Sequence, residues 1–176
     1  MSIRTARRHI VLATAFCGLL LLFKPALVTA EDYSQASPVT DLQQVGTLSE
    51  RRTIPILLLV SREQCSYCRL LKREILQPSQ LGGDLKDRVI LQEILIDPGQ
   101  HLKDFQGQPR LATEFASDYG INLTPTLLFL DSQGRELTDP LVGVNTLEMY
   151  GFYLDTAVAQ AQKALHGQTP KTIDGQ

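Results

Sequence analysis

Two cysteines in the run Cys65-Ser66-Tyr67-Cys68 are the residues of this sequence best suited to chemistry. A pair at this spacing can cycle between dithiol and disulfide, supply half of a metal site, or form a structural disulfide. The spacing alone does not decide among these three roles. The choice depends on the sequence around the pair.

That surrounding sequence argues against a metal site and against a purely structural disulfide. Zinc sites usually need four ligands, and after residue 30 the chain offers only these two cysteines with His101 and His166. A disulfide stabilises mainly by restricting the unfolded chain, and a loop this short contributes little. We therefore favour a redox couple, and we expect no metal.

The pair lies where a strand is expected to meet a helix. Residues 54–60 are a short, nearly continuous apolar run, which indicates a strand buried on both faces. After it, Cys68, Leu71 and Ile75 recur at helical spacing on one face, and Pro78 is expected to end the helix. The dithiol is thus predicted at a strand-to-helix junction.

This junction suggests different roles for the two thiols. The N–H groups and dipole at a helix start favour a thiolate and can lower a cysteine pKa from about 8.5 to about 3.5–7.5. Cys65, at the helix start, is therefore predicted to be the attacking thiolate. Cys68, one turn further along on the apolar face, is predicted to resolve the mixed disulfide. The nearby cations Arg62, Arg69 and Lys72 either add to this stabilisation or form a solvated helix face.

The rest of the chain predicts an α/β domain with a mixed sheet. We expect helices over about 40–52 and around Leu111 to Tyr119, and strands over 89–96 and 126–130. Gly120 can cap the second of these helices. The polar turn that follows the last strand is expected to lead into a hairpin partner, which gives the sheet an antiparallel edge.

Three further segments complete this picture. Residues 97–109 hold two prolines and two glycines and are predicted to be a loop or small insertion. The hairpin partner is expected at 135–138. A last helix is predicted to run to Leu165, with Asn145 and Glu148 as a capping box.

The first thirty residues are typical of a signal peptide. A basic start precedes an apolar stretch over 10–23, and small residues end at Ala30, after which we expect cleavage. The alternative is an uncleaved membrane anchor, which Lys24 and Pro25 disfavour. The Arg7-Arg8 pair hints at twin-arginine export, and Cys17 lacks the small preceding residue of a lipoprotein. We therefore expect a bacterial periplasmic protein.

The domain boundaries follow from this order of segments. We predict a signal peptide over 1–30, a flexible lead-in over 31–38, one globular domain over 39–166 and a disordered tail over 167–176. Cleavage removes four basic residues and no acidic ones, so 17 Lys and Arg fall to 13 against 19 Asp and Glu, a net charge of −6. Nothing in this balance suggests a nucleic-acid partner.

Two motifs resemble a known family. The stretch 65–76 (CSYCRLLKREIL), placed after a buried strand, resembles the active-site segment of exported thioredoxin-like proteins. The run 119–129 (YGINLTPTLLF) resembles the segment around the cis-proline of thioredoxin. The resemblance covers about residues 39–165 and implies the thioredoxin-like fold, a central mixed sheet flanked by helices.

The same resemblance implies a substrate groove. Only about 5–6% of X–Pro bonds are cis in folded proteins, so a cis bond before Pro125 is expected from the resemblance alone. It implies that Thr124 and Pro125 face the dithiol and bind an extended substrate peptide, together with Ser66 and Tyr67. The alternative is an ordinary turn at the start of a strand.

Two positions depart from thioredoxin itself. Leu59, six residues before Cys65, stands where thioredoxin has a buried aspartate that assists proton transfer, so that role is not carried over. Gln64 replaces the usual aromatic residue before the first cysteine. With Thr124 before the proline, the sequence resembles periplasmic proteins of the Dsb and Sox types more closely than cytosolic thioredoxin.

These observations predict a periplasmic thiol:disulfide oxidoreductase that reduces or exchanges disulfides in exported proteins. We expect no cofactor other than the redox-active Cys65–Cys68 disulfide. The electron donor would be a membrane-embedded thiol protein, and the protein would be a monomer. The alternatives are a thiol oxidase and a Cu(I) metallochaperone, although neither Met1 nor Met149 is near the pair in sequence. A dimeric isomerase is disfavoured because residues 31–64 cannot hold a dimerisation domain.

Overall fold

A computed structural model describes residues 38–167 of the chain. The predicted signal peptide, residues 31–37 of the lead-in and residues 168–176 of the tail lie outside the described residues. The positions of all other predicted elements can be compared with the structure.

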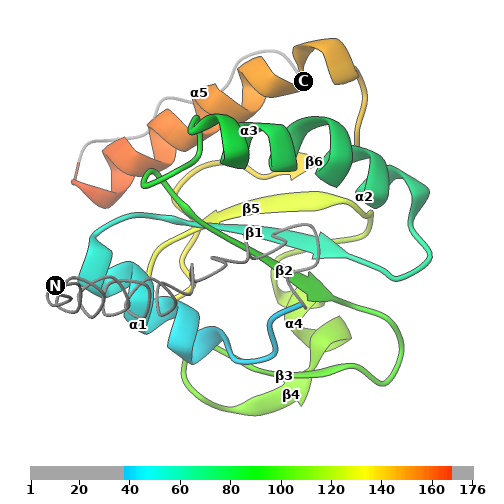
Figure 1. Cartoon of the computed structure of the whole chain (residues 1–176). Coiled ribbons are helices and arrows are strands. Elements are labelled where there is room, and N and C mark those ends of the chain that lie inside the picture. The colour runs from blue at the N-terminus through cyan, green and yellow to red at the C-terminus, as the bar shows by residue number, and fades with distance from the viewer. Residues whose placement is uncertain (1–37, 168–176) are drawn as a thin grey trace, which may run out of the picture. The chain divides into compact units, whose positions relative to one another are not determined.

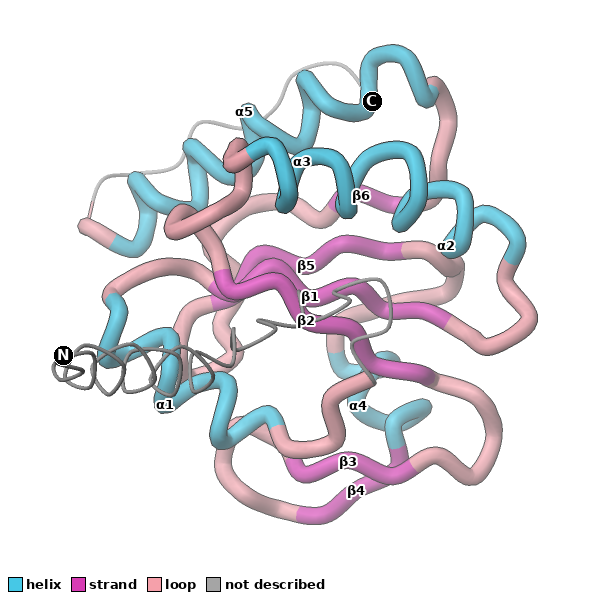
Figure 2. The backbone as a smooth tube through the Cα atoms, in the orientation of Figure 1, coloured by secondary structure: helices cyan, strands magenta, loops and turns pink. Residues whose placement is uncertain are grey.

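Four strands form a mixed sheet in the order β2-β1-β5-β6 (Figures 1 and 2). β1 (Ile56–Ser61) is parallel to β2 (Ile90–Leu95) and antiparallel to β5 (Thr126–Leu130). β6 (Leu141–Val142) pairs antiparallel with β5 at the sheet edge. The mixed sheet and its antiparallel edge are therefore confirmed.

Helices cover both faces of this sheet, as Figure 1 shows. One face packs against α1 (Leu42–Arg52) and α4 (Ala112–Asp118). The other face packs against α2 (Ser66–Leu71), η2 (Lys72–Leu76) and α5 (Leu147–Leu165). α3 (Gln77–Gly82) continues the helix from η2 and has no buried residue. The predicted α/β sheet flanked by helices is confirmed.

β1 contributes to the core on both sides of the sheet. Ile56, Leu58 and Val60 pack in the cluster with α1 and α4, whereas Leu57 and Leu59 pack in the cluster with α5. All six β1 residues are buried. Because successive strand residues face opposite sides, a continuous apolar run is what such a central strand requires.

The helix after the dithiol does not end at Pro78, so that prediction is wrong. A turn of π-helix over Lys72–Leu76 is followed directly by α3, in which Pro78 occupies the first turn. Proline lacks an N–H and clashes with the carbonyl four residues earlier in an α-helix. The wider π turn lies where this conflict would arise, and it moves Leu76 rather than Ile75 into the fully buried position.

The segment 97–109 is more ordered than the loop that the sequence suggests. It contains β3 (His101–Lys103) and the first residue of β4 (Pro109–Leu111), which pair antiparallel as a separate two-stranded sheet. The buried Asp104 side chain accepts backbone N–H groups of Gln106 at 3.0 Å and Gln108 at 2.8 Å. This carboxylate holds the turn between the two short strands.

Two other local predictions need correction. Residues 135–138 do return beside β5, but only through an isolated bridge between Leu130 and Glu136 and a hydrogen bond from the Leu137 N–H to the Phe129 carbonyl at 2.8 Å. The strand that pairs with β5 is β6. The capping box at Asn145 is absent, because the helix begins after Thr146, which makes no side-chain cap hydrogen bond.

A buried carboxylate explains why the chain turns away from β5 at residue 131. Asp131 accepts the backbone N–H groups of Gln133 at 2.8 Å and Arg135 at 2.9 Å, and the Arg135 guanidinium at 2.7 Å. Beside it, the Tyr119 hydroxyl donates to the Gly134 carbonyl at 2.7 Å. Burial raises the pKa of Tyr119 to about 12, so this hydroxyl stays a donor at neutral pH.

Replacing Asp131 with alanine should lower the free energy of unfolding by about 1–3 kcal/mol, because the turn N–H groups lose their acceptor. Urea denaturation measures this change. Asp139→Ala, at an exposed aspartate of the same loop, is the matched control and should stay within about 0.5 kcal/mol of the wild type. Equal losses in the two variants would show that the carboxylate does not hold the turn.

Candidate active site

Cys65 begins the helix that follows β1. Its backbone is extended (φ −112°, ψ 104°), it occupies the N-cap of α2, and its Sγ accepts the Cys68 N–H at 3.1 Å. The Arg69 N–H bonds to the Cys65 carbonyl at 3.2 Å. The sulfur therefore does what a capping serine or aspartate oxygen does elsewhere, and a negative charge on it is stabilised there.

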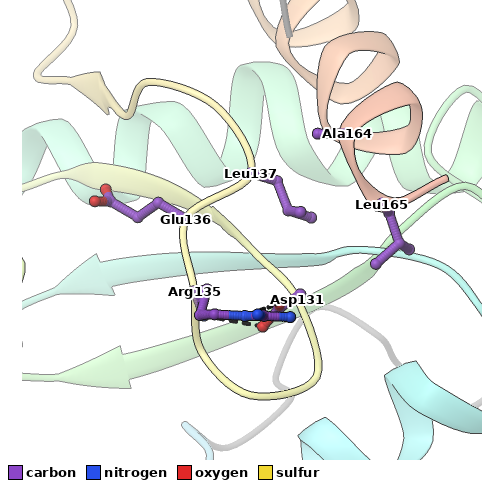
Figure 3. A pocket seen from close by; sticks show the side chains of 6 residues that line it. All are labelled: Asp131, Arg135, Glu136, Leu137, Ala164 and Leu165. Carbon is purple, nitrogen blue, oxygen red and sulfur yellow. Dashed lines mark hydrogen bonds and ion pairs between the residues drawn. The ribbon is translucent and has the colours of Figure 1, made fainter. Parts of the chain in front are cut away.

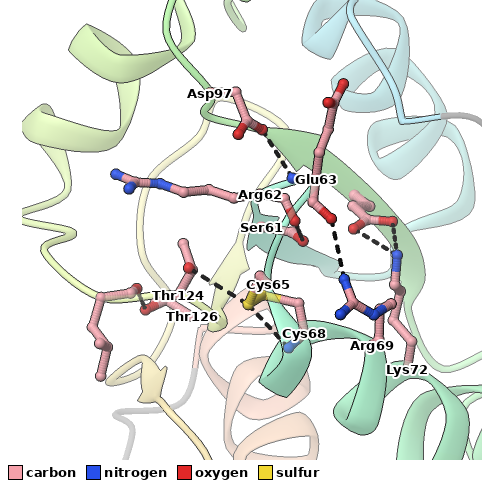
Figure 4. The surroundings of a disulfide bond; sticks show 12 residues. Ser61, Arg62, Glu63, Cys65, Cys68, Arg69, Lys72, Asp97, Thr124 and Thr126 are labelled. Carbon is pink, nitrogen blue, oxygen red and sulfur yellow. Dashed lines mark hydrogen bonds and ion pairs between the residues drawn. A yellow bond between two sulfur atoms is a disulfide. The ribbon is translucent and has the colours of Figure 1, made fainter.

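Cys65 and Cys68 form a disulfide, with their Cα atoms 5.2 Å apart (Figure 4). Cys65 is partly exposed, whereas Cys68 is only 1% exposed. The difference in exposure agrees with the predicted order of attack, because only Cys65 can meet a bulky partner. Cys68 faces the protein interior, and from there it can attack the Cys65 sulfur.

The loop before β5 lies beside the disulfide, as the sequence resemblance implied. The Thr124–Pro125 bond is cis, and the Thr124 hydroxyl lies 3.7 Å from the Cys65 Sγ (Figure 4). The pairing of Val60 with Thr126 brings the loop to the end of β1 from which the dithiol starts. The Gly143 N–H bonds to the Pro125 carbonyl at 2.8 Å and ties the loop to β6. The predicted cis bond and its place beside Cys65 are confirmed.

Some residues next to Cys65 and Thr124 in sequence have exposed side chains. Ser66 and Tyr67 lie in the first turn of α2, and Tyr67 is 59% exposed. Leu123, one residue before Thr124, is 55% exposed. Exposed apolar side chains such as Tyr67 and Leu123 are able to contact a partner protein. Contacts of Ser66, Tyr67, Thr124 and Pro125 with substrate stay predictions.

The charged residues near the dithiol make defined contacts. Arg69 donates to the Glu63 carbonyl at 3.3 Å, and Asp97 accepts the Glu63 N–H at 3.0 Å, so both hold the loop before Cys65. Lys72 donates to both carboxylate oxygens of Glu93 at 2.9 Å. Sequence reasoning missed Glu93 and Asp97, because they follow the dithiol by more than twenty residues and carry no local signal.

Leu59 lies in the apolar cluster between the sheet and α2, and it is 1% exposed. Its register partners are Glu93 on β2 and Leu127 on β5. The departure noted in the sequence therefore has a structural consequence: β1 provides no ionisable group beneath the dithiol.

Neither Cys65 nor Cys68 lines either of two cavities in the described part of the chain. The larger, about 370 Å³, lies beside the turn that follows β5 and the last residues of α5 (Figure 3). The smaller, about 280 Å³, lies between β6 and the start of α5. The larger is lined by Asp131, Arg135, Glu136, Leu137, Ala164 and Leu165. Within residues 38–167 there is neither a cluster of three metal-ligating side chains nor a helix long and apolar enough to cross a membrane.

The fold and the site together define a thioredoxin-like protein with a disulfide at the start of its active-site helix. A family model described as a thioredoxin-like domain matches residues 43–157, and the chain belongs to this family. Family membership and the Cys65–Cys68 pair make the chain a thiol:disulfide oxidoreductase in the general sense.

One similar solved structure supports this fold, and two others share a weaker likeness with the chain. A DsbH oxidoreductase has a TM-score of 0.51 at 19% identity and covers 75% of this chain and 92% of its own. A poplar thioredoxin h has a TM-score of 0.45 at 20% identity, covering 67% and 95%. A Fasciola hepatica thioredoxin has a TM-score of 0.46 at 16% identity, and the match covers 71% of this chain and 99% of the thioredoxin. The comparison with curated proteins found no match.

Proposed function

We propose that this protein works in the bacterial periplasm, where it reduces or exchanges disulfides in exported proteins. One observation carries the proposal: the half-buried residue Cys65 caps α2 with its sulfur beside the Thr124 hydroxyl, and its disulfide partner Cys68 is buried. This arrangement suits an attacking thiol and a resolving thiol. It requires no cofactor beyond the disulfide itself.

The proposed reaction consists of two exchanges. In the reduced protein, the Cys65 thiolate attacks one sulfur of a substrate disulfide, forms a mixed disulfide and releases the other substrate sulfur as a thiolate. The Cys68 thiolate then attacks Cys65, which forms the Cys65–Cys68 bond and releases the second substrate sulfur. Two electrons pass to the substrate, and a membrane-embedded thiol donor returns them to the protein, which acts as a monomer.

The direction can be tested with two model substrates. With a chemical thiol as electron source, the protein should accelerate the reduction of insulin, followed by the turbidity of its released chains. It should accelerate the oxidation of a reduced disulfide protein much less. If oxidation alone is accelerated, the protein is a thiol oxidase. If neither reaction is accelerated and the pair binds Cu(I) tightly, the metallochaperone function replaces both.

The exported protein should begin near Glu31, because the basic, apolar and small-residue order before it is that of a cleaved signal. N-terminal sequencing of the protein recovered from the periplasm tests this. A matched variant with a bulky residue at Ala30 should leave an unprocessed chain. Mature protein that still begins at Met1 would show that the segment is a membrane anchor.

A further inference from the structure

The resolving thiol lies where it cannot easily lose a proton. A thiolate, not a thiol, is the nucleophile, and apolar surroundings raise the pKa of a thiol. Cys68 is 1% exposed, so bulk water has little access to it, least of all while Cys65 carries a partner protein. A group within the protein has to accept this proton at the moment of resolution.

β1, the strand beneath α2, offers no such group. Its residues are Ile-Leu-Leu-Leu-Val-Ser, and Leu57 and Leu59 fill the face toward the helix. On the other neighbouring strand, β5, the register partner of Leu59 is Leu127. A proton acceptor for Cys68 therefore has to come from β2 or from the helix itself.

β2 provides a carboxylate at the matching position. Glu93 is the register partner of Leu59, so its side chain leaves the same face of the sheet. Its two carboxylate oxygens accept Lys72 Nζ at 2.9 Å each. The Glu93 side chain is only 14% exposed, and that of Lys72 is 36% exposed.

Lys72 connects this carboxylate to the helix face of Cys68. The Lys72 N–H bonds to the Cys68 carbonyl, which places the two residues one turn apart, with Cβ atoms about 5–6 Å from each other. Figure 4 shows Lys72 and Cys68 on the same helix beside the strands. Exposure rises from Cys68 through Glu93 to Lys72, so a proton held by Glu93 is closer to solvent than one held by Cys68.

Other ionisable groups around the dithiol have different positions. Arg69 and Asp97 bond to the main chain at Glu63, and Arg62 lies in the same exposed loop. From α5, Tyr150 is buried, and burial raises its pKa above the ordinary tyrosine value. Glu93 differs from these groups because its carboxylate is half-buried and lies on the sheet face toward α2.

We propose that Glu93, held in place by Lys72, is the proton acceptor for Cys68 during resolution. The inference rests on the proposed function. The Cys68 proton passes through water to a Glu93 oxygen, the Cys68 thiolate attacks the Cys65 sulfur, and the substrate sulfur leaves with the electron pair of the broken bond. Glu93 then returns the proton to the leaving thiolate or to solvent along the exposed side of Lys72. Glu93 thus touches no substrate and acts on the reaction through Cys68, and Lys72 positions the Glu93 carboxylate.

The two steps can be separated with a coloured aromatic disulfide, dithiobis(nitrobenzoate). Attack by Cys65 of the reduced protein releases one coloured thiolate, and resolution by Cys68 releases a second. Stopped-flow records of both phases across pH follow each cysteine in turn. Glu93→Gln retains an acceptor for Lys72 but cannot take a proton, so the second phase should slow about a hundredfold at neutral pH and recover at alkaline pH. The first phase should keep its rate.

Two further variants complete the test. Glu93→Asp, which retains a base, should restore much of the second phase. Asp155→Asn, which breaks the 2.6 Å ion pair with Arg88 before the start of β2, should change neither phase. If Glu93→Gln leaves the second phase unchanged at every pH, or slows both phases equally along with a lower melting temperature, the proposal is wrong. If the wild-type protein releases only one coloured thiolate, the proposed function itself fails.

Discussion

The Cys68→Ala variant should accumulate mixed disulfides with its substrates, and the Cys65→Ala variant should form none and lose all turnover. Cys65 is the partly exposed sulfur at the start of α2, where the Cys68 N–H and the helix dipole stabilise its thiolate. Without the Cys68 sulfur, the bond between Cys65 and its partner cannot be resolved from within the protein. Nonreducing gels and mass spectrometry of trapped complexes measure this.

The pH dependence of alkylation checks the same assignment independently. In the Cys68→Ala variant, the backbone N–H at position 68 still reaches the Cys65 sulfur, so Cys65 should react with an apparent pKa well below about 8.5. In the Cys65→Ala variant, the buried Cys68 should react slowly at every pH. If Cys68 proved the more acidic thiol, or if Cys65→Ala still reduced insulin, the two roles would be wrongly assigned.

Replacing Phe129 with alanine should lower the free energy of unfolding by about 3–5 kcal/mol. Phe129 is fully buried in β5, opposite Leu57 of β1, and belongs to the cluster between the sheet and α5. Deleting the ring removes its burial and leaves a cavity that the close-packed layer cannot fill. Because a whole domain is stable by only about 5–15 kcal/mol, this one change should threaten the fold.

Phe152→Ala is the matched control, because the same substitution on α5 removes a ring that is 63% exposed. Its effect should remain within about 0.5 kcal/mol of the wild type. Urea denaturation should show a lower midpoint for Phe129→Ala with an unchanged slope, which indicates the same surface exposed on unfolding. Equal losses in the two variants would contradict the burial of the sheet face toward α5.

Features with strong local signals could be predicted from the sequence. The short, continuous apolar runs of β1 and β5 are typical of strands buried on both faces, and the structure has both strands. The dithiol follows β1 directly, so its place at a helix start follows from neighbouring residues. The cis bond before Pro125 has no such local cause, and its prediction depended on the likeness to thioredoxin.

Features that depend on side chains distant in sequence could not be predicted. The chain leaves β5 at Asp131 because a buried carboxylate gathers the following N–H groups. Nothing in residues 135–138 indicates that they pair with β5 only at the bridge to Leu130, and that the ladder forms at β6. β2 is an edge strand in which only Ile90 and Ile94 are fully buried, and its other residues are half-buried. Its less apolar face is what allows Glu93 to meet Lys72, a contact across 21 positions.

The helix through Pro78 shows a limit of local rules. Proline predicts a helix end because it lacks an N–H and crowds the preceding turn. In this chain a π turn over Lys72–Leu76 shifts the hydrogen-bond register just before it, and the helix continues to Gly82. The packing of Leu76 and Leu71 against the sheet compensates for the irregular turn, and that packing is a property of the whole domain.

The reduction potential of the Cys65–Cys68 pair tests most directly whether the pair is a redox couple. The mature domain would be equilibrated in glutathione buffers of graded ratio, and the dithiol fraction would be measured after rapid alkylation. If the pair is redox-active, the midpoint potential of its two-electron transition should lie between about −270 and −120 mV, the range from thioredoxin to DsbA. If the protein is a reductant, the potential should lie in the more negative half of this range. A pair that stays oxidised to below about −300 mV would be a structural disulfide, and the catalytic roles assigned to Cys65 and Cys68 would be wrong.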